Sequence, residues 1–194
     1  MLVRFWGTRG SIPSPITSRD IKAKIVEALL SADGRRFADE AEANAFVDGE
    51  LEFPVGNTYG ANTSCVELDL GEGEFMVFDM GSGLRPFGID AIERFGDGRP
   101  KTFNIFMSHL HWDHILGFPF FNPAFMPGCK LNFFGGHRQI EYALRRQQEK
   151  ISFPVPFDFM KAEMEFTTLT PGETYEIGGC EVGLIKQCHD NDSF

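Results

Sequence analysis

The stretch Ser108–His114 reads SHLHWDH and holds three of the five histidines of this chain, together with one aspartate. The apolar run Thr102–Ser108 leads into it and is typical of a buried strand. His109 and His111 are two residues apart, so at the end of an extended segment their side chains should point to the same side. The stretch therefore predicts a pair of imidazoles facing one point in space.

Asp113 and His114 follow where the chain turns toward Gly117. This order lets two imidazoles bind one divalent ion while a carboxylate and a third imidazole bind a neighbouring ion. We expect two divalent ions, with Zn²⁺ favoured and Mn²⁺ or Fe²⁺ as alternatives, because all three accept such ligands. Two ions roughly 3.5–4 Å apart can hold a hydroxide between them and clamp a leaving oxygen. The alternative is that these are ordinary surface histidines that bind no metal. Three histidines and an aspartate within six residues make this alternative less favoured.

The composition describes a globular, acidic chain of 194 residues, with 18 Lys and Arg against 28 Asp and Glu and a net charge of −10. Such a charge disfavours a long nucleic acid as the partner, although a local basic patch is compatible with it. We expect no membrane span and no signal peptide, since no apolar stretch is long enough. The four cysteines form no close pair, which favours reduced thiols and a cytoplasmic location.

The rest of the sequence predicts a mixed order of strands and helices. Helices are expected over Ser18–Ser31, inside an insertion covering about residues 17–50, and over Ile89–Phe95 and Arg138–Ile151. The last helix is expected to face inward with Ile140, Ala143, Leu144 and Ile151. Strands are expected over Leu2–Phe5, Cys65–Leu70, Glu74–Asp79, Thr102–Ser108, Lys130–Phe134, Glu165–Leu169, Thr174–Ile177 and Glu181–Ile185. So many strands adjacent in sequence favour antiparallel or mixed sheets over a doubly wound parallel sheet.

The pattern His-x-His-x-Asp-His resembles the signature of the metallo-β-lactamase-fold hydrolases. Further segments resemble the phosphodiesterase-like and tRNA-processing-nuclease-like branch of that superfamily, namely Phe5–Ser11, Gly60–Cys65, Phe78–Gly83 and His109–Phe121. The resemblance runs from the first strand to about residue 189. The metal motif is specific for the fold and much less specific for the substrate.

The resemblance implies an α+β fold, a four-layer αββα sandwich of the metallo-β-lactamase type that forms a single domain over residues 1–194. It also implies that His109 and His111 bind the first metal and that Asp113 and His114 bind the second. His189, downstream of a predicted hairpin, fits the place of the third ligand of the first metal. Asp113 is in addition the expected catalytic carboxylate.

The family pattern also includes a bridging aspartate and a final histidine farther downstream. No residue before Phe194 can be assigned to them, although Asp190 or Asp192 could substitute for the aspartate. We therefore expect the second half of the fold to be short or truncated. A short second half would leave a sheet edge exposed, which favours a homodimer.

The resemblance implies a metal-dependent hydrolase, and we expect a phosphodiesterase that uses a metal-bound hydroxide on a small or cyclic phosphodiester. One alternative is an RNA-processing nuclease of the same fold, which would need a basic groove. Thioester or amide hydrolysis is another, and a non-catalytic metal-binding or ligand-binding protein is a third. Asp79 is expected to orient metal ligands. Trp112 and the loop Phe118–Phe121 would either wall a pocket or pack in the core.

Overall fold

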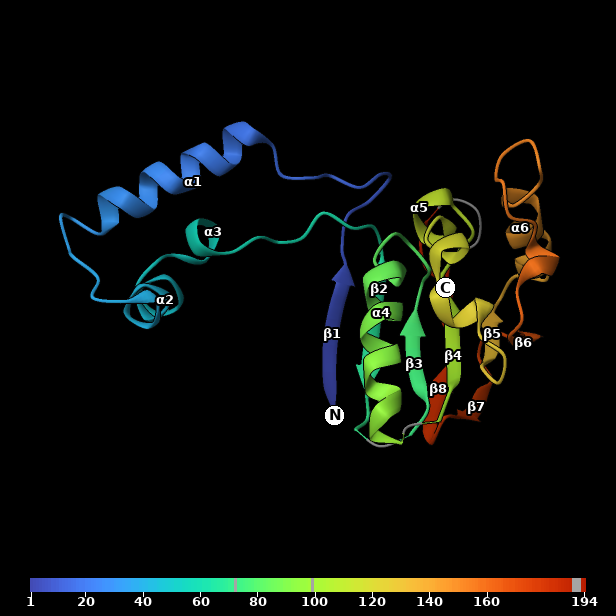
Figure 1. Cartoon of the computed structure of the whole chain (residues 1–194). Helices are drawn as coiled ribbons and strands as arrows, with labels where there is room; N and C mark the ends of the chain where they lie inside the picture. The colour runs from blue at the N-terminus through green and yellow to red at the C-terminus, as the bar shows by residue number, and fades with distance from the viewer. Residues whose placement is uncertain (72, 99, 190–192) are drawn as a thin grey trace. The chain divides into compact units, whose positions relative to one another are not determined.

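The chain forms two compact units in the computed structural model, which describes residues 1–71, 73–98, 100–189 and 193–194 (Figure 1). One unit comprises Met1–Pro13 together with Asn62–Phe194, and it contains every strand of the structure described below. The other unit, Ser14–Ala61, contains only helices. The predicted metal motif belongs to the first unit.

Strands and helices alternate through most of the first unit. Its strands are β1 (Leu2–Gly7), β2 (Cys65–Asp69), β3 (Phe75–Phe78), β4 (Thr102–Met107), β5 (Lys130–Gly135), β6 (Glu163–Thr168), β7 (Thr174–Ile177) and β8 (Cys180–Gly183). Its α-helices are α4 (Leu84–Arg94), α5 (Trp112–Ile115) and α6 (Ile140–Gln147), and its 3₁₀ turns are η1 (Phe95–Asp97), η2 (Phe118–Phe120), η3 (Asn122–Phe125) and η4 (Phe157–Phe159).

Six of these strands form one mixed sheet in which β1 to β6 lie side by side in chain order. The pairs β1–β2 and β2–β3 are antiparallel, whereas β3, β4, β5 and β6 run parallel to one another. Strands β7 and β8 form a separate antiparallel hairpin. The expected mixed sheet is thus confirmed. Because β3 and β4 are parallel neighbours, the loops after them emerge at the same edge of the sheet, and the metal motif follows β4 there.

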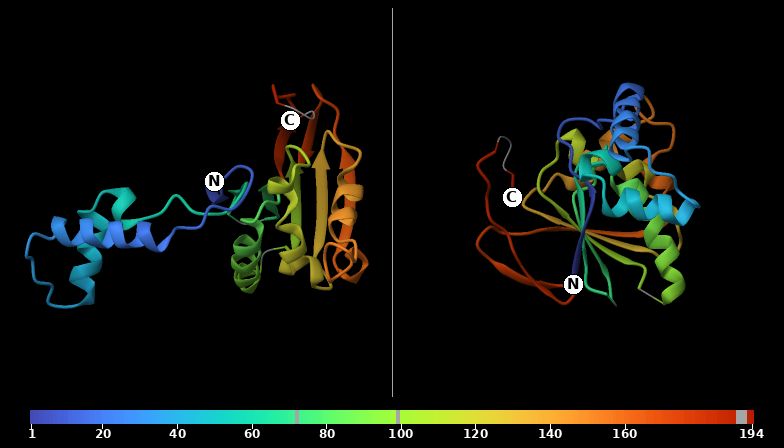
Figure 2. Two further views of the ribbon diagram at one scale, coloured as in Figure 1. Left: turned by 90° about the horizontal axis from the view of Figure 1, so that it is seen from above. Right: turned by 90° about the vertical axis from the view of Figure 1, so that its left-hand side faces the viewer.

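The two faces of the sheet have different partners. On one face the fully buried Phe75, Phe103 and Phe133 belong to a continuous hydrophobic core that includes Phe87 of α4. Both views in Figure 2 place the hairpin β7–β8 on the side of the sheet opposite to α4. Period-two alternation explains this division. The odd-numbered Phe75, Phe103 and Phe133 of β3, β4 and β5 face the helix, and the even-numbered phenylalanines of the same strands line the cavity on the hairpin side.

The second unit consists of helices α1 (Ser18–Ser31), α2 (Glu40–Gly49) and α3 (Phe53–Gly56). Thr17 and Asp20 form a capping box at the start of α1, which satisfies two backbone N–H groups. Lys24 donates hydrogen bonds to the carbonyls of Pro54 and Asn57 and so ties α1 to α3. None of the residues of α1 is buried.

Two helices differ from their predicted extent. Helix α4 begins at Leu84, five residues before the predicted start, because a proline is tolerated in a first turn and Gly88 lets the helix lie directly against the ring of Phe121. Helix α6 ends at Gln147, where the chain turns back toward β6 through Gln148, whose side chain donates to Val155 O. The prediction that Ile151 faces inward is wrong, because this residue is 92% exposed. In the part of the chain that the structure describes, no helix has the length and apolarity to cross a membrane.

Candidate metal centre

The motif begins where β4 ends at the edge of the sheet. His109 is 5% exposed, and its Nε2 atom lies 3.1 Å from Nδ1 of His111. Their ring centroids are 4.6 Å apart. The two imidazoles therefore face one point, as expected for residues two apart on an extended segment.

His189 reaches the same point from the segment that follows β8. Its ring centroid is 4.9 Å from that of His109 and 5.7 Å from that of His111. Each of the three histidines offers one nitrogen, and these nitrogens all lie within 4.8 Å of one another. Three imidazoles converging in this way form a donor set that suits Zn²⁺ and other borderline divalent cations. We call these three residues the histidine cluster.

Asp113 and His114 lie beside the histidine cluster on the short helix α5. Nε2 of His114 is 3.4 Å from Oδ2 of Asp113, and the rings of His114 and His109 have centroids 4.0 Å apart. A hydrogen bond from outside the pair fixes each of the two residues. Asp113 Oδ2 accepts a hydrogen bond of 2.8 Å from the backbone N–H of Ser11, and Nδ1 of His114 lies 2.7 Å from Oδ2 of Asp79. We call Asp113 and His114 the Asp–His pair.

Asp79 follows β3 and forms hydrogen bonds to the residue before β2, to the residue after β4 and to His114 of the metal motif. This residue follows β3 with φ of +63°, a left-handed conformation that aspartate adopts more readily than most residues. Its carboxylate accepts hydrogen bonds from the backbone N–H of Ser108 at 2.9 Å and from the hydroxyl of Ser64 at 3.0 Å. A carboxylate that bonds Nδ1 of a histidine fixes the ring and leaves Nε2 for a ligand. Asp79 therefore orients the ring of His114, the residue expected to bind the second metal.

Close backbone contacts fix the turn that carries the Asp–His pair. A Cβ atom on Gly81 would lie 2.4 Å from the carbonyl oxygen of Asp113, and one on Gly117 would lie 2.0 Å from the carbonyl oxygen of Gly81. Real Cβ atoms do not approach backbone so closely, so neither position tolerates a side chain in this packing. Two backbone hydrogen bonds add to it, from Met80 N–H to His114 O at 2.8 Å and from Gly117 N–H to Met80 O at 2.9 Å.

The protonation of the site differs between its parts. Burial, followed by the nearby charges of His114 and His111, lowers the pKa of His109 to about 4, so this imidazole is neutral at pH 7. Burial alone would lower the pKa of His114, but the hydrogen bond to Asp79 and the negative charges of Asp79 and Asp113 outweigh it and raise that pKa. Burial opposes ionisation of Asp113, yet the hydrogen bond from Ser11 and the charge of His114 lower the pKa of its carboxyl.

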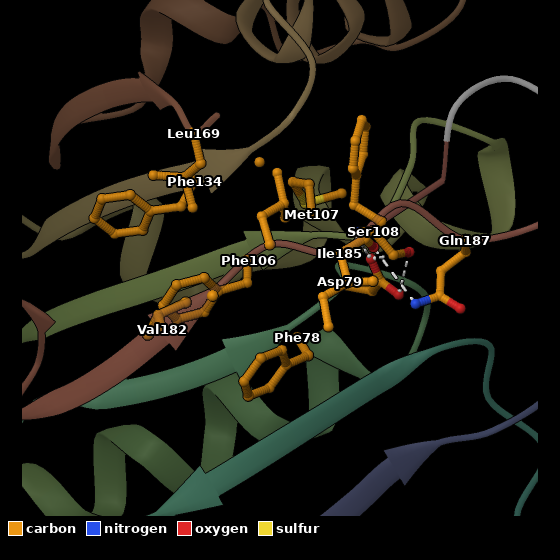
Figure 3. A pocket seen from close by; sticks show the side chains of 14 residues that line it. Phe78, Asp79, Phe106, Met107, Ser108, Phe134, Leu169, Val182, Ile185 and Gln187 are labelled. Carbon is orange, nitrogen blue, oxygen red and sulfur yellow. Dashed lines mark hydrogen bonds between the residues drawn. The ribbon is translucent and has the colours of Figure 1, made fainter. Parts of the chain in front are cut away.

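An apolar cavity of about 270 Å³ adjoins the residues that support the motif. Phe78, Phe106 and Phe134 from three neighbouring strands stack along one wall, and Val182 and Ile185 line it from the hairpin side (Figure 3). Ser108 and Asp79 lie at its polar end, joined by hydrogen bonds.

The aromatic residues near the motif divide between the core and the surface. Phe118 and Phe121 are fully buried, which agrees with core packing. Trp112 is 81% exposed and Phe120 is 49% exposed, so among the aromatic residues from Trp112 to Phe121 these two could contact a ligand.

Sequence reasoning overlooked two residues that hold the site. Ser108 places its hydroxyl 3.1 Å from Nδ1 of His109 and 3.3 Å from Nδ1 of His114, and only its position directly before the motif could have signalled this. Ser11 reaches Asp113 across 102 residues through a backbone N–H, which no sequence pattern encodes. Asp190 and Asp192, considered above as substitute ligands, lie outside the residues that the structure describes.

Comparison of the chain with protein-family models finds no match, and comparison with curated proteins finds no match either. The geometry of the histidine cluster and of the Asp–His pair is therefore the basis of the functional argument.

Proposed function

We propose that this protein is a metal-dependent hydrolase that cleaves phosphodiesters. The observation that carries the proposal is the meeting of His109, His111 and His189 at one point, although His189 is far from the other two in sequence. The Asp–His pair beside that point supports a second cation. Sites built from several imidazoles and a carboxylate are typical of Zn²⁺, Mn²⁺ or Fe²⁺ centres that perform hydrolysis.

The donor atoms fit such ions. His109, His111 and His189 would hold one cation, and His109 is already in the neutral form that binds a metal. Asp113 and His114 would contribute to holding a second, with Nε2 of His114 directed toward the carboxylate of Asp113. When bound, two such cations supply activation of water near neutral pH and neutralise charge on a phosphodiester.

The chain's own groups would position the reactants of the hydrolysis. In that reaction a water oxygen bonds to phosphorus, the bond from phosphorus to one ester oxygen breaks, and the proton lost by the water ends on the leaving alkoxide. Asp113 is ionised at neutral pH, so its carboxylate can accept a hydrogen bond from the attacking water. Asp79 and Ser11 act through His114 and Asp113, which makes them positioning residues.

The proposal also assigns the chain to the metallo-β-lactamase fold. A six-stranded mixed sheet with helices on one face and a hairpin on the other is compatible with two sheets packed inside an αββα sandwich, the hairpin belonging to the second sheet. The sequence segments named above resemble the phosphodiesterase-like and nuclease-like branch, and we include that branch in the proposal. The acidic net charge of −10 favours a small phosphodiester over a long RNA.

The test is metal analysis of the purified protein combined with hydrolysis of bis(p-nitrophenyl) phosphate. We expect close to two divalent ions per chain and release of p-nitrophenolate that a chelator abolishes. His111→Ala and Asp113→Ala should each lose the activity, whereas His137→Ala, a histidine outside the centre, should retain it. Metal binding without turnover of any phosphodiester, unchanged by the first two substitutions, would refute the proposal.

One observation favours a second candidate, a protein that binds a metal ion without catalysing hydrolysis. Among the described residues, only the histidine cluster unites three or more side chains suited to a metal, so the Asp–His pair alone offers two ligand atoms. A stoichiometry of one ion per chain, together with absent turnover, would support this candidate.

A further inference from the structure

A hollow of about 420 Å³ lies beside the turn that carries the Asp–His pair. It is distinct from the apolar cavity under the hairpin, with which it shares no lining residue. Its lining comes from the segment before β2, the first turn of α4 and the chain around η2, and consists of Asn62, Ser82, Arg85, Pro86, Leu116, Gly117 and Phe120.

The wall of this hollow is continuous with the metal motif. Gly117 follows His114 by three residues, and its N–H donates to Met80 O, while Met80 N–H donates to the carbonyl of His114. Ser82 directly follows Gly81, which packs against the carbonyl of Asp113. A molecule held in the hollow would therefore lie close to the backbone that positions Asp113 and His114.

The polar part of the lining is rigid and uncharged except at one residue. Ser82 Oγ donates to Asn62 Oδ1 at 3.0 Å and accepts from the N–H of Thr63 at 3.0 Å, so both side chains are fixed. Arg85 is exposed, and within the described residues no carboxylate pairs with it, although acidic residues outnumber basic ones 28 to 18. An arginine without a carboxylate partner beside a hollow can pair with an anion of a ligand.

The apolar part of the lining suits a flat group. Phe120 is 49% exposed, whereas its neighbours Phe118 and Phe121 are fully buried in the core. Pro86 and Leu116 complete an apolar wall beside it. An exposed ring next to an unpaired guanidinium offers stacking for an aromatic group and a bidentate partner for an acidic group attached to it.

We propose that the hollow binds a part of the substrate that carries a second negative charge on an aromatic spacer, so that the preferred substrate is a phosphodiester with an additional acidic group. The proposal rests on the proposed function, because the diester itself would occupy the metal centre. Arg85 pairs with the second anion, and Phe120 stacks on the spacer. Both are specificity-determining residues and neither takes part in bond cleavage.

The test compares two chromogenic diesters that differ in a single charge, p-nitrophenyl 4-carboxyphenyl phosphate and its 4-carbamoylphenyl counterpart. We expect the metal-loaded protein to show a KM about tenfold lower for the carboxylate, with a similar kcat, because a hydrogen-bonded charge pair is worth about 1.5 kcal/mol or more. Arg85→Gln should erase this difference, and Arg85→Lys should restore part of it. Arg146→Gln removes the same charge from the exposed face of α6 and should leave the difference intact.

Calorimetry on the metal-free protein separates this inference from the proposed function. Binding of 4-carboxyphenyl methyl phosphate should weaken about tenfold in Arg85→Gln and should weaken for both the acid and its amide in Phe120→Ala. If Arg85→Gln binds the acid as tightly as the unaltered protein does, or if Arg146→Gln weakens binding equally, the inference is wrong. If calorimetry gives the expected losses while no diester is hydrolysed, the binding role of the hollow is supported and the proposed hydrolysis is wrong.

Discussion

The histidine cluster and the Asp–His pair lie side by side, yet the chain builds them in different ways. The cluster gathers His109 and His111 from the end of β4 and His189 from the segment after β8, which meet only because the chain folds. The pair consists of neighbours in sequence, held in place by Ser11 and Asp79. The cluster offers three candidate ligand atoms and the pair offers two, whereas the pair is better supported by hydrogen bonds. This difference predicts tight binding of one ion and weaker binding of a second.

Protonation sharpens this difference. His109 has its pKa lowered to about 4 and offers a neutral nitrogen at pH 7, so a cation displaces no proton there. His114 has its pKa raised by Asp79 and Asp113, so a cation must compete with a proton at the Asp–His pair. Coordination by His109 should therefore depend less on pH near neutrality than coordination by His114.

Removing a ligand of the cluster should have the largest effect. We expect His109→Ala to weaken binding of the tighter ion by more than about 100-fold, because losing a direct ligand should exceed the 10–100-fold cost of losing an outer partner. Competition with a chromogenic zinc chelator measures the affinity, and circular dichroism checks that the variant is folded. His137→Ala is the matched control, since it removes a histidine outside the cluster. Equal affinities of the His109→Ala variant and the unaltered protein would show that the histidine cluster does not bind the tighter ion.

His189→Ala tests whether the segment after β8 truly completes the cluster. His189 is exposed, so its removal should not affect folding, and we expect a loss of about 100-fold in affinity for the tighter ion. Both variants keep two residues of the cluster, but His109 is buried whereas His189 is exposed, so the loss should be smaller than that of His109→Ala. A titration that shows no change would place the third ligand elsewhere.

Asp79→Asn should affect the Asp–His pair more than the cluster. The amide can still bond Nδ1 of His114, but it removes the negative charge that orients and polarises the ring. We expect about tenfold weaker binding of the second ion, with the affinity of the first changed less. Calorimetric titration that resolves the two binding steps provides the measurement. Equal losses of affinity at both steps would show that Asp79 supports the cluster as much as the pair. That result would contradict the distinction between the two sites.

The sequence predicts the local parts of the centre better than the distant ones. Period-two alternation and residue spacing correctly placed His109 and His111 together, because both obey rules within one segment. His189 was matched by resemblance, since spacing alone cannot bring the segment after β8 to the end of β4. The support of Asp113 by Ser11 N–H escaped notice because a backbone donor carries no residue-specific signal.

The fold shows the same division between local and distant rules. The strands β1 to β8 were each expected within a few residues, since alternation and turn residues mark them. The start of α4 was missed because Pro86 and Gly88 indicate a break when read alone. Packing against Phe121 explains why a glycine is accommodated there. Tertiary contacts of this kind override local propensity.

The last prediction concerns stability of the metal-free protein, in which the two parts of the centre should have opposite pH dependence. His109 has a folded pKa of about 4, below the ordinary 6.5, so the unfolded chain binds the proton more readily and stability falls as pH drops from about 6.5 to 4. His114 has a raised folded pKa, so its contribution is full below about 6.5 and is lost as pH rises through that folded value.

Urea unfolding in the presence of a chelator, repeated from pH 4 to pH 8, separates the two contributions. His109→Asn should flatten the loss of stability between pH 6.5 and pH 4, because no proton is then excluded from a buried imidazole. His114→Asn should flatten the opposite slope above pH 6.5 and leave the acidic limb steep. Since each variant also changes stability by a constant amount, the slope and not the midpoint is the readout. Identical slopes in both variants would mean that the cluster and the pair titrate as one unit, and the difference between them in metal affinity would lose its electrostatic explanation.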